Sequence, residues 1–285
     1  MSESAALQVI ADLLYAKTGQ EVTESRRWRV PAALHGIFKE LRIDGLEELA
    51  RILQGTHSAD LPGRIVDALL NNETYFFRDR NYFELLMQQI LPAIAERRSA
   101  TRRLRIWSAG CSTGQEPLSL AMLLLAEPER WRRWSIDIVA TDVSAKAIRA
   151  AKAGAYSQFE IQRGISITEM LTHFAKHKTQ WRAQDALRRM VRFQQANLLN
   201  GLPGEEPFDL VLCRNVLMYF APEARERALA RLHGALAPDG WLMLGAGETV
   251  LEQPRLLRAA GCGAGLYQPL LADERTGLGQ LAAPV

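Results

Sequence analysis

Between residues 5 and 70, apolar side chains recur every three or four positions, the spacing that buries one face of a helix. Asp44-Gly45 interrupts this pattern, and Asp60-Leu61-Pro62 starts it again. The apolar positions on this spacing include Leu7, Ile10, Leu13, Leu14, Leu34, Ile37, Phe38, Leu41, Leu46, Leu49, Ile52, Leu53, Ile65, Val66 and Leu69. Because no strand pattern occurs here, residues 1–70 are predicted to form a small all-helical N-terminal domain.

From residue 103 onward, short apolar runs of strand length alternate with helical patterns. The predicted strands are Leu104–Trp107, Ile136–Asp142, Met190–Phe193, Phe208–Cys213, Gly240–Leu244 and, as a last edge strand, Gly265–Pro269. The predicted helices between them are Leu118–Ala126, Ala145–Ala153 and Glu223–Leu236. This alternation is typical of the α/β class with a doubly wound parallel sheet.

Two stretches do not follow the alternation. Tyr156–Arg189 has only weak helical spacing and is interpreted as an insertion that decorates the sheet. Within it, His173 and His177 stand one helical turn apart, which is a possible metal-ligand spacing. Because no acidic or cysteine ligand is near them in the sequence, an exposed helix face is favoured and no metal is predicted. Residues 271–285 carry no periodicity and are expected to be a tail or linker.

The richest motif runs from Ile106 to Pro117, where an apolar strand leads into a turn with two glycines and then into a helix. Pro117 suits the first turn of that helix. Gly110 and Gly114 allow a ligand to approach the backbone closely at the carboxyl end of the strand. A plain strand-to-helix turn is the alternative to a cofactor loop.

An acidic residue that ends the second strand of such a sheet typically binds ribose hydroxyls of an adenosine ligand. Asp142 has that place. The alternative makes Asp142 the N-cap of the helix Ala145–Ala153, but Ser144 is the better cap candidate, and Gly154 is predicted to stop this helix. The loop lacks the G-x-G-x-x-G fingerprint and the Gly-Lys-Ser/Thr of phosphate cradles. An uncharged loop suits S-adenosylmethionine, which has no phosphates, and Glu116 is placed to bind its ammonium group or a ribose hydroxyl.

The same loop also spells Gly-x-Ser-x-Gly, the nucleophile elbow of α/β hydrolases. This alternative makes Ser112 the nucleophile, with an acid such as Asp209 and a base such as His233. It is disfavoured because His233 falls within a predicted helix and not in a loop after the last strands.

Composition narrows the choice of partners. With 48% hydrophobic residues and a net charge of +3, the chain has the balance of a globular protein and gives no reason to expect nucleic acid. The widely spaced Cys111, Cys213 and Cys262 suggest neither a disulfide framework nor a metal site. Without a signal peptide or a membrane-spanning run, a cytoplasmic protein without membrane insertion is expected.

Arginine is locally concentrated in three clusters. Such clusters are most often solvated faces, although some mark a surface for a partner. They comprise Arg26, Arg27 and Arg29; Arg102, Arg103 and Arg105; and Arg130, Arg132 and Arg133. Both interpretations stay open at the level of sequence.

Four separated segments in the same order resemble the CheR-type chemoreceptor (protein-glutamate) O-methyltransferases. They are Asn72–Arg78, Trp107–Pro117, Ala140–Ser144 and Phe208–Phe220. The resemblance implies a helical N-terminal domain (1–70) and a Rossmann-like class I methyltransferase domain (71–270) with a small inserted subdomain (157–192). The implied reaction is methyl transfer from S-adenosylmethionine to glutamate carboxylates of chemoreceptors in chemosensory adaptation.

The resemblance also implies roles for individual residues. Asn72, Thr74 and Arg78 belong to a segment that closes over the cofactor, and Arg78 with Tyr219 positions the substrate carboxylate as the catalytic pair. The remaining implied cofactor contacts are Gly110, Glu116 and Asp142 for the amino-acid and ribose parts, Asn197 and Leu198 for the adenine, and Arg214 and Asn215 for the methionine end.

The implied partner is the cytoplasmic helical region of methyl-accepting chemoreceptors, and a monomer is expected. In the family the second helix usually carries several basic residues, whereas Pro31–Lys39 here is nearly uncharged. The insertion around Lys176–Trp181 is shorter than in members that dock a receptor's C-terminal peptide, so docking without such a tether is expected. The non-enzyme alternative is a degenerate cofactor-binding signalling module, against which the presence of Arg78 and Tyr219 speaks.

Overall fold

The computed structural model of the chain describes residues 1–251, 255–261, 263 and 265–270. These residues form two compact units. The first unit comprises residues 1–71 together with 219–225, and the second comprises residues 72–218 together with the described residues from 226 onward. The predicted tail, 271–285, lies outside the described residues. No helix in the described part of the chain combines the length and the apolar character needed to cross a membrane.

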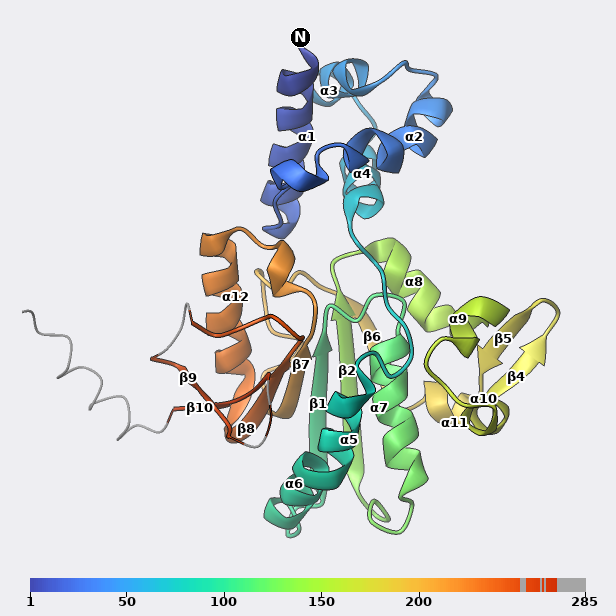
Figure 1. Cartoon of the computed structure of the whole chain (residues 1–285), viewed down its shortest axis with the longest axis vertical. Helices are drawn as coiled ribbons and strands as arrows, with labels where there is room; N and C mark the ends of the chain where they lie inside the picture. Colours follow the sequence, from blue (N-terminus) through green and yellow to red (C-terminus); the bar gives the residue numbers. More distant parts are fainter. Residues whose placement is uncertain (252–254, 262, 264, 271–285) are drawn as a thin grey trace, which may run out of the picture. The chain divides into compact units, whose positions relative to one another are not determined.

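The first unit is helical, as predicted. Its helices are α1 (Glu3–Thr18), the short η1 (Glu24–Arg26), α2 (Arg29–Leu41), α3 (Leu46–Gln54) and α4 (Leu61–Leu69) (Figure 1). Ser2 caps α1 by accepting a hydrogen bond from the Ala5 backbone N–H, and Gly19 ends it in a left-handed conformation. Their apolar faces enclose one core around Ile10, Leu34 and Leu49.

The second unit contains a seven-stranded sheet in the order β6-β2-β1-β7-β8-β10-β9. Its strands are β1 (Arg103–Ala109), β2 (Ser135–Asp142), β6 (Val191–Gln195), β7 (Phe208–Cys213), β8 (Leu236–Leu244), β9 (Leu257–Ala259) and β10 (Leu266–Pro269). From β6 to β8 every neighbouring pair is parallel, whereas β10 is antiparallel to both β8 and β9. The central strands β1 and β7 are buried on both faces, which explains their continuous apolar runs.

Two sequence expectations about these elements are wrong. Gly265–Pro269 was expected at the sheet edge, but β10 lies between β8 and the unpredicted β9, which is the edge. The helical spacing of Tyr82, Phe83, Leu86 and Ile90 predicts a helix that ends near Leu91-Pro92, before the first strand. Instead α5 (Arg80–Leu85) continues through a π-helical turn, η2 (Leu86–Ile90), into α6 (Leu91–Arg97), because proline is tolerated in the first turn of α6.

Helices cover the parallel strands. α7 (Gln115–Ala126) and α8 (Ala145–Ala153) both pack against β2 and β6. Ser144 caps α8, and Gly154 ends it, both as predicted. The helix α12 (Pro222–Ala235) buries Ala228, Leu229 and Leu232 completely.

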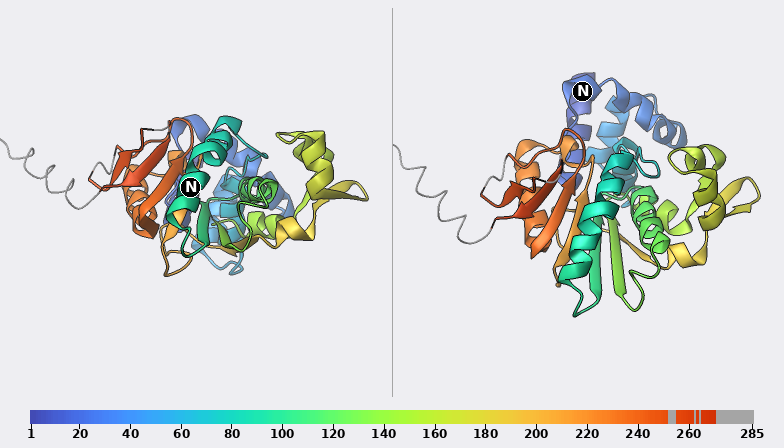
Figure 2. Two further views of the ribbon diagram at one scale, coloured as in Figure 1. Left: turned by 90° about the horizontal axis from the view of Figure 1, so that it is seen from below. Right: turned by 60° about the horizontal axis from the view of Figure 1, so that its bottom comes forward.

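The irregular stretch after α8 forms a second, antiparallel sheet, in the order β3-β5-β4. Its elements are β3 (Ala155–Ser157), α9 (Gln158–Gln162), α10 (Ile167–His173), β4 (Phe174–His177), β5 (Gln180–Ala183) and α11 (Asp185–Arg188). Within the second unit, β9 and β10 lie at one edge of the large sheet, and the small sheet lies beyond the other edge (Figures 1 and 2). His173 ends α10 and His177 ends β4, so the two do not share one helix face, contrary to expectation.

Candidate functional site

The candidate site lies in the second unit, at the carboxyl ends of β1, β2, β6 and β7. There the glycine loop follows β1, and its Gly110 and Gly114 have positive φ angles of 79° and 96°. A Cβ at Gly110 would lie 2.4 Å from a methyl carbon of Val216. The backbone N–H groups of Gly110 and Cys111 both donate to the carbonyl oxygen of Thr141, so the loop is fastened to β2. Only glycine fits this close approach.

Asp142, the last residue of β2, is buried and fixes the same loop. One carboxylate oxygen accepts a hydrogen bond from the Ser112 backbone N–H at 2.8 Å, and the other accepts from Ser144 N–H at 2.8 Å. The helix cap of α8 is Ser144, whose hydroxyl accepts from the Ala147 backbone N–H. The Asp142 carbonyl accepts from Ala196 N–H, which brings Asn197 and Leu198 beside the end of β2.

Glu116 lies in the first turn of α7, facing the end of β1. Its carboxylate accepts a hydrogen bond from the Ser108 hydroxyl at 2.8 Å and pairs with the Arg214 guanidinium at 3.3 Å. Burial raises the pKa of the Glu116 carboxyl, and Arg214 and Ser108 offset part of that rise. A buried carboxyl with a shifted pKa is typical of a binding site.

Arg214 follows β7, and its side chain is only 1% exposed. Besides Glu116, its guanidinium binds the carboxylate of Asp79 and the carbonyl oxygen of Arg78, both at 2.8 Å. The guanidinium also lies 4.9 Å from the centre of the Tyr82 ring. Arg214 therefore joins the end of β7 to α7 and to the segment before α5, while its own Nε has no hydrogen-bond partner among the described residues.

Asn215 has a left-handed backbone (φ 59°), and its buried Oδ1 is also without a partner among the described residues. Glu248 holds this turn in place. One of its carboxylate oxygens accepts from the N–H groups of Asn215 and Gly245, and the other accepts from Val216 and Met218. Sequence reasoning missed this role of Glu248, because the backbone groups that it binds on residues 215–218 lie at least 30 residues earlier in the chain.

The segment 72–79 is attached to the glycine loop. The Ser112 hydroxyl donates to the carbonyl oxygen of Asn72 at 2.8 Å, and the Phe77 N–H donates to the Ser119 hydroxyl on α7. Arg78 donates to the Glu73 carbonyl oxygen, and its guanidinium lies 5.7 Å from the centre of the Tyr75 ring. Thr74 is half-buried in this segment. Asn72, Arg78, Gly110, Glu116, Asp142, Asn197, Leu198, Arg214 and Asn215 thus share one region of the second unit.

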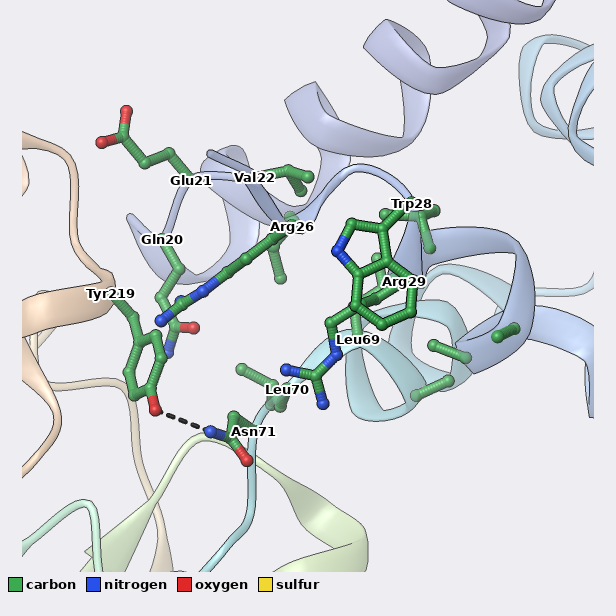
Figure 3. Close-up of a pocket in the computed structure, with 15 residues that line it drawn as sticks. Gln20, Glu21, Val22, Arg26, Trp28, Arg29, Leu69, Leu70, Asn71 and Tyr219 are labelled. Carbon is green, nitrogen blue, oxygen red and sulfur yellow. Dashed lines mark hydrogen bonds between the residues drawn. The ribbon is translucent and has the colours of Figure 1, made fainter. Parts of the chain in front are cut away.

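Tyr219, the other residue of the predicted catalytic pair, belongs to the first unit. It follows directly on the turn that Glu248 holds. Its hydroxyl accepts a hydrogen bond from Asn71 Nδ2 at 2.6 Å, and the Arg26 guanidinium lies 4.3 Å from its ring centre. Figure 3 shows Tyr219 and Asn71 facing the same pocket of this unit.

The hydrolase alternative is wrong. Asp209 lies at the amino end of β7, where its carboxylate binds Arg98 and the Arg105 backbone N–H, whereas Ser112 follows the carboxyl end of β1. His233 lies in the last turn of α12. The three residues therefore do not assemble into a triad, and the Ser112 hydroxyl instead fastens Asn72.

The residues present fit S-adenosylmethionine. Buried or half-buried carboxylates of Asp142, Glu116 and Asp79 outnumber the two guanidinium groups of Arg78 and Arg214, which suits a cationic ligand and not a polyphosphate. Asn215 Oδ1 is a buried acceptor without a partner among the described residues, so it can accept a hydrogen bond from a donor of a ligand.

The strand order and the carboxylate pair at the glycine loop define a Rossmann-like, S-adenosylmethionine-dependent methyltransferase. A protein-family model described as "CheR methyltransferase, SAM binding domain" matches residues 72–265. The chain belongs to this CheR methyltransferase family, and S-adenosylmethionine is its cofactor.

Curated relatives agree over most of the chain. The chemotaxis protein methyltransferase 1 of Pseudomonas aeruginosa is 38% identical, over 85% of this chain and 89% of the relative. The chemotaxis protein methyltransferase Cher2 of Pseudomonas putida is 36% identical, over 86% and 90%. A chemotaxis protein methyltransferase of Vibrio parahaemolyticus is 32% identical, over 90% and 94%.

Proposed function

We propose that this methyltransferase esterifies glutamate side chains of chemoreceptors, using S-adenosylmethionine as the methyl donor. The relatives are named chemotaxis protein methyltransferases, and the two residues that the family resemblance assigns to the substrate, Arg78 and Tyr219, are both present. The proposal includes a cytoplasmic location and action on the cytoplasmic helical region of the receptors.

The chemistry of the site supports a carboxylate substrate. A glutamate side chain, with a pKa of about 4.3, is already ionised at neutral pH and needs no general base. The one thiol in the glycine loop is Cys111, and burial raises its pKa far above the ordinary value, so it stays protonated. S-adenosylmethionine supplies the electrophilic methyl group, and the protein's task is to hold a carboxylate oxygen in line with it, about 3 Å away.

We assign the orientation of that carboxylate to Arg78 and Tyr219. Among the described residues, the Arg78 guanidinium donates one hydrogen bond, to a carbonyl oxygen, while the neighbouring Glu73 carboxylate binds Arg163 at 2.9 Å. Of the five N–H donors of a guanidinium, most thus stay available for a substrate. One or two such bonds orient a carboxylate, whereas a full bidentate clamp would lower its nucleophilicity.

For the cofactor we propose the following roles. Asp142 binds the ribose, Glu116 binds the ammonium group, and Asn197 with Leu198 flanks the adenine. Arg214 and Asn215 line the methionine end, with the Asn215 Oδ1 as the acceptor, while Asn72 and Thr74 close over the site. The role of Asp142 is supported by its burial and by its hydrogen bond to the glycine loop. That of Glu116 is supported by its place in the first turn of α7, directly after the loop, where it binds Ser108 of β1.

The test is transfer of a tritiated methyl group to host membranes that contain chemoreceptors, with wild type, Arg78→Ala and Arg78→Lys. We expect base-labile labelling of receptor bands by wild type, about 100-fold slower labelling by Arg78→Ala, and partial recovery in Arg78→Lys. Calorimetric titration with S-adenosylhomocysteine is the control, and the three proteins should bind it alike. Cofactor binding without any methyl-ester formation would contradict the proposal and favour a signalling module without turnover.

The same assay tests docking without a peptide tether. β4 and β5 are joined by the two residues Lys178 and Thr179 alone, so the hairpin offers little additional surface. We expect a receptor truncated after its helical region to be labelled as fast as the full receptor. A large loss of labelling on truncation would contradict this expectation.

A further inference from the structure

The segment that contains Arg78, the residue to which we assign the substrate carboxylate, has two acidic residues of its own, Glu73 and Asp79. Each of these acids is bound by a different arginine. The Asp79 carboxylate binds Arg214 at 2.8 Å, and the Glu73 carboxylate binds Arg163 at 2.9 Å. Arg78 itself forms no ion pair with a carboxylate of the described residues. Both acids of the segment are therefore kept from the arginine that the substrate needs.

Glu73 lies within reach of Arg78. The Arg78 guanidinium donates to the carbonyl oxygen of Glu73 itself, at 3.1 Å. The guanidinium groups of Arg163 and Arg78 lie 4.1 Å and 5.7 Å from the centre of one ring, that of Tyr75. The hydrogen bond and the charge of Arg163, and to a lesser extent the charge of Arg78, lower the pKa of the Glu73 carboxyl, so it is ionised at neutral pH. Two arginines thus lie close enough to compete for one carboxylate.

The ion pair between Arg163 and Glu73 is not needed to attach the segment. Gly164, in the loop between α9 and α10, has a φ of 103°, and the Phe76 carbonyl oxygen lies where its Cβ would be. Arg80 donates to the Gly164 carbonyl oxygen at 2.8 Å, and the Phe76 ring packs edge-on against two aromatic rings of the inserted subdomain. With side chains 41% and 56% exposed, the ion pair itself adds little stability.

We infer that Arg163 is a positioning residue, which binds Glu73 and thereby leaves Arg78 free for the carboxylate of the substrate. This inference rests on the proposed function. Without Arg163, the Glu73 carboxylate would pair with Arg78 and compete with the substrate for the same N–H donors. An internal competitor lowers the fraction of protein that is ready to bind, and a high concentration of substrate displaces it. Loss of Arg163 should therefore raise KM and leave kcat nearly unchanged.

Arg80 is the matched control for Arg163. Both arginines join the segment to the inserted subdomain, and Arg80 does so through the Gly164 carbonyl oxygen and through Glu169 at 3.5 Å. In the described part of the chain Arg80 is not bound to the Glu73 carboxylate, which Arg163 holds. Loss of either arginine weakens the attachment, but only the loss of Arg163 releases Glu73.

The test is methyl transfer to receptor membranes, measured as a function of receptor concentration. Arg163→Gln should raise the KM for receptor about three- to fivefold, the size expected for competition by an exposed ion pair. The double variant Glu73→Gln/Arg163→Gln should return KM to near the wild-type value, because the competing carboxylate is gone. Arg163→Lys keeps the positive charge and should stay closer to wild type than Arg163→Gln.

Restoration by Glu73→Gln distinguishes this role from a purely structural one. Arg80→Gln weakens the attachment without releasing Glu73, so adding Glu73→Gln to it should not improve its KM. An unchanged KM in Arg163→Gln, or a raised KM that Glu73→Gln does not restore, would overturn the inference. Equal restoration in the two double variants would also overturn it, because Glu73 would then hinder the reaction whether or not Arg163 is present.

Folding and cofactor binding are measured on the same proteins. Because the ion pair is exposed, all variants should unfold close to the wild-type temperature, as followed by circular dichroism. Their affinity for S-adenosylhomocysteine, measured by calorimetric titration, should equal that of wild type. An absence of receptor labelling by wild type would contradict the proposed function, whereas a normal wild type without the Arg163 effect would contradict only the role of Arg163.

Discussion

The two ends of the large sheet each contain a buried or half-buried arginine between two acids, and the two arrangements differ in completeness. At the amino end, Arg98 donates from Nε to Asp209 at 2.7 Å and from a terminal nitrogen to Asp239 at 2.9 Å. Asp209 also accepts from the Arg105 backbone N–H, so both of its oxygens are bonded. The Arg98 guanidinium lowers the pKa of Asp239, as expected for a satisfied ion pair.

At the carboxyl end, Arg214 lies between Glu116 and Asp79, but the network is incomplete. Arg214 Nε and Asn215 Oδ1 have no partner among the described residues, and the pKa of Glu116 is raised by burial. An unsatisfied buried polar atom costs about 1–3 kcal/mol, so it is retained only where something offsets it. The complete network indicates a structural role and the incomplete one a binding role.

The largest expected effect is a loss of cofactor affinity when Asp142, at the carboxyl end of the sheet, is replaced by Asn. Asp239, at the amino end, is the matched control. In Asp142→Asn, an amide N–H₂ replaces one of the two oxygens that accept from Ser112 and Ser144. Because the proposed contact with the ribose is weakened as well, we expect about 100-fold lower affinity for S-adenosylhomocysteine, or about 3 kcal/mol. Asp239→Asn should leave that affinity unchanged. Calorimetric titration measures both, and equal losses would show that the two ends do not differ in function.

The next largest effect concerns stability at the amino end. Arg98→Ala leaves the 9%-exposed carboxylate of Asp209 without its cation. Removing one partner of a buried pair is destabilising, and after allowance for partial exposure we expect about 2 kcal/mol less free energy of unfolding. Urea denaturation followed by circular dichroism measures this change. If Arg98→Ala also loses cofactor affinity, the amino end takes part in binding and the distinction fails.

The sequence predicts well those features that depend on residues close together in the chain. The path from β1 through the glycine loop into α7, the Ser144 cap and the Gly154 stop depend on neighbouring residues, and all are confirmed. The family resemblance implies that Arg214 and Asn215 line the methionine end of the cofactor, but no sequence pattern indicated that Arg214 reaches Asp79, 135 residues away.

The features that were not predicted from the sequence depend mostly on contacts between distant segments. Glu248 binds four backbone N–H groups, three of them on a turn at least 30 residues earlier, so its local sequence carries no sign of the role. β10 was placed at the edge because β9, with three residues, is too short to produce an alternating pattern. His173 and His177 looked like a helical pair, but the start of β4 at Phe174 separates them.

The smallest expected effect is a difference in pH dependence between the two ends. The raised pKa of Glu116 means that its buried negative charge costs stability at neutral pH, and this cost is relieved as the pH falls through that raised value. The lowered pKa of Asp239 has the opposite sign. Its contribution is present above the ordinary aspartate pKa and is lost as the pH falls through the lowered value.

The pH dependence of cofactor affinity should reflect the protonation of Glu116 and not that of Asp239. As the pH falls into the range where Glu116 takes up a proton, the site loses the negative charge that we propose binds the ammonium group, so S-adenosylhomocysteine should bind more weakly. This loss should begin at a higher pH than the ordinary glutamate pKa, because burial raises the pKa of Glu116. Glu116→Gln should bind more weakly at neutral pH and show a flatter profile, whereas Asp239→Asn should keep the wild-type profile. Titration calorimetry at a series of pH values decides the matter, and identical profiles for wild type and Glu116→Gln would exclude Glu116 as the group that holds the ammonium.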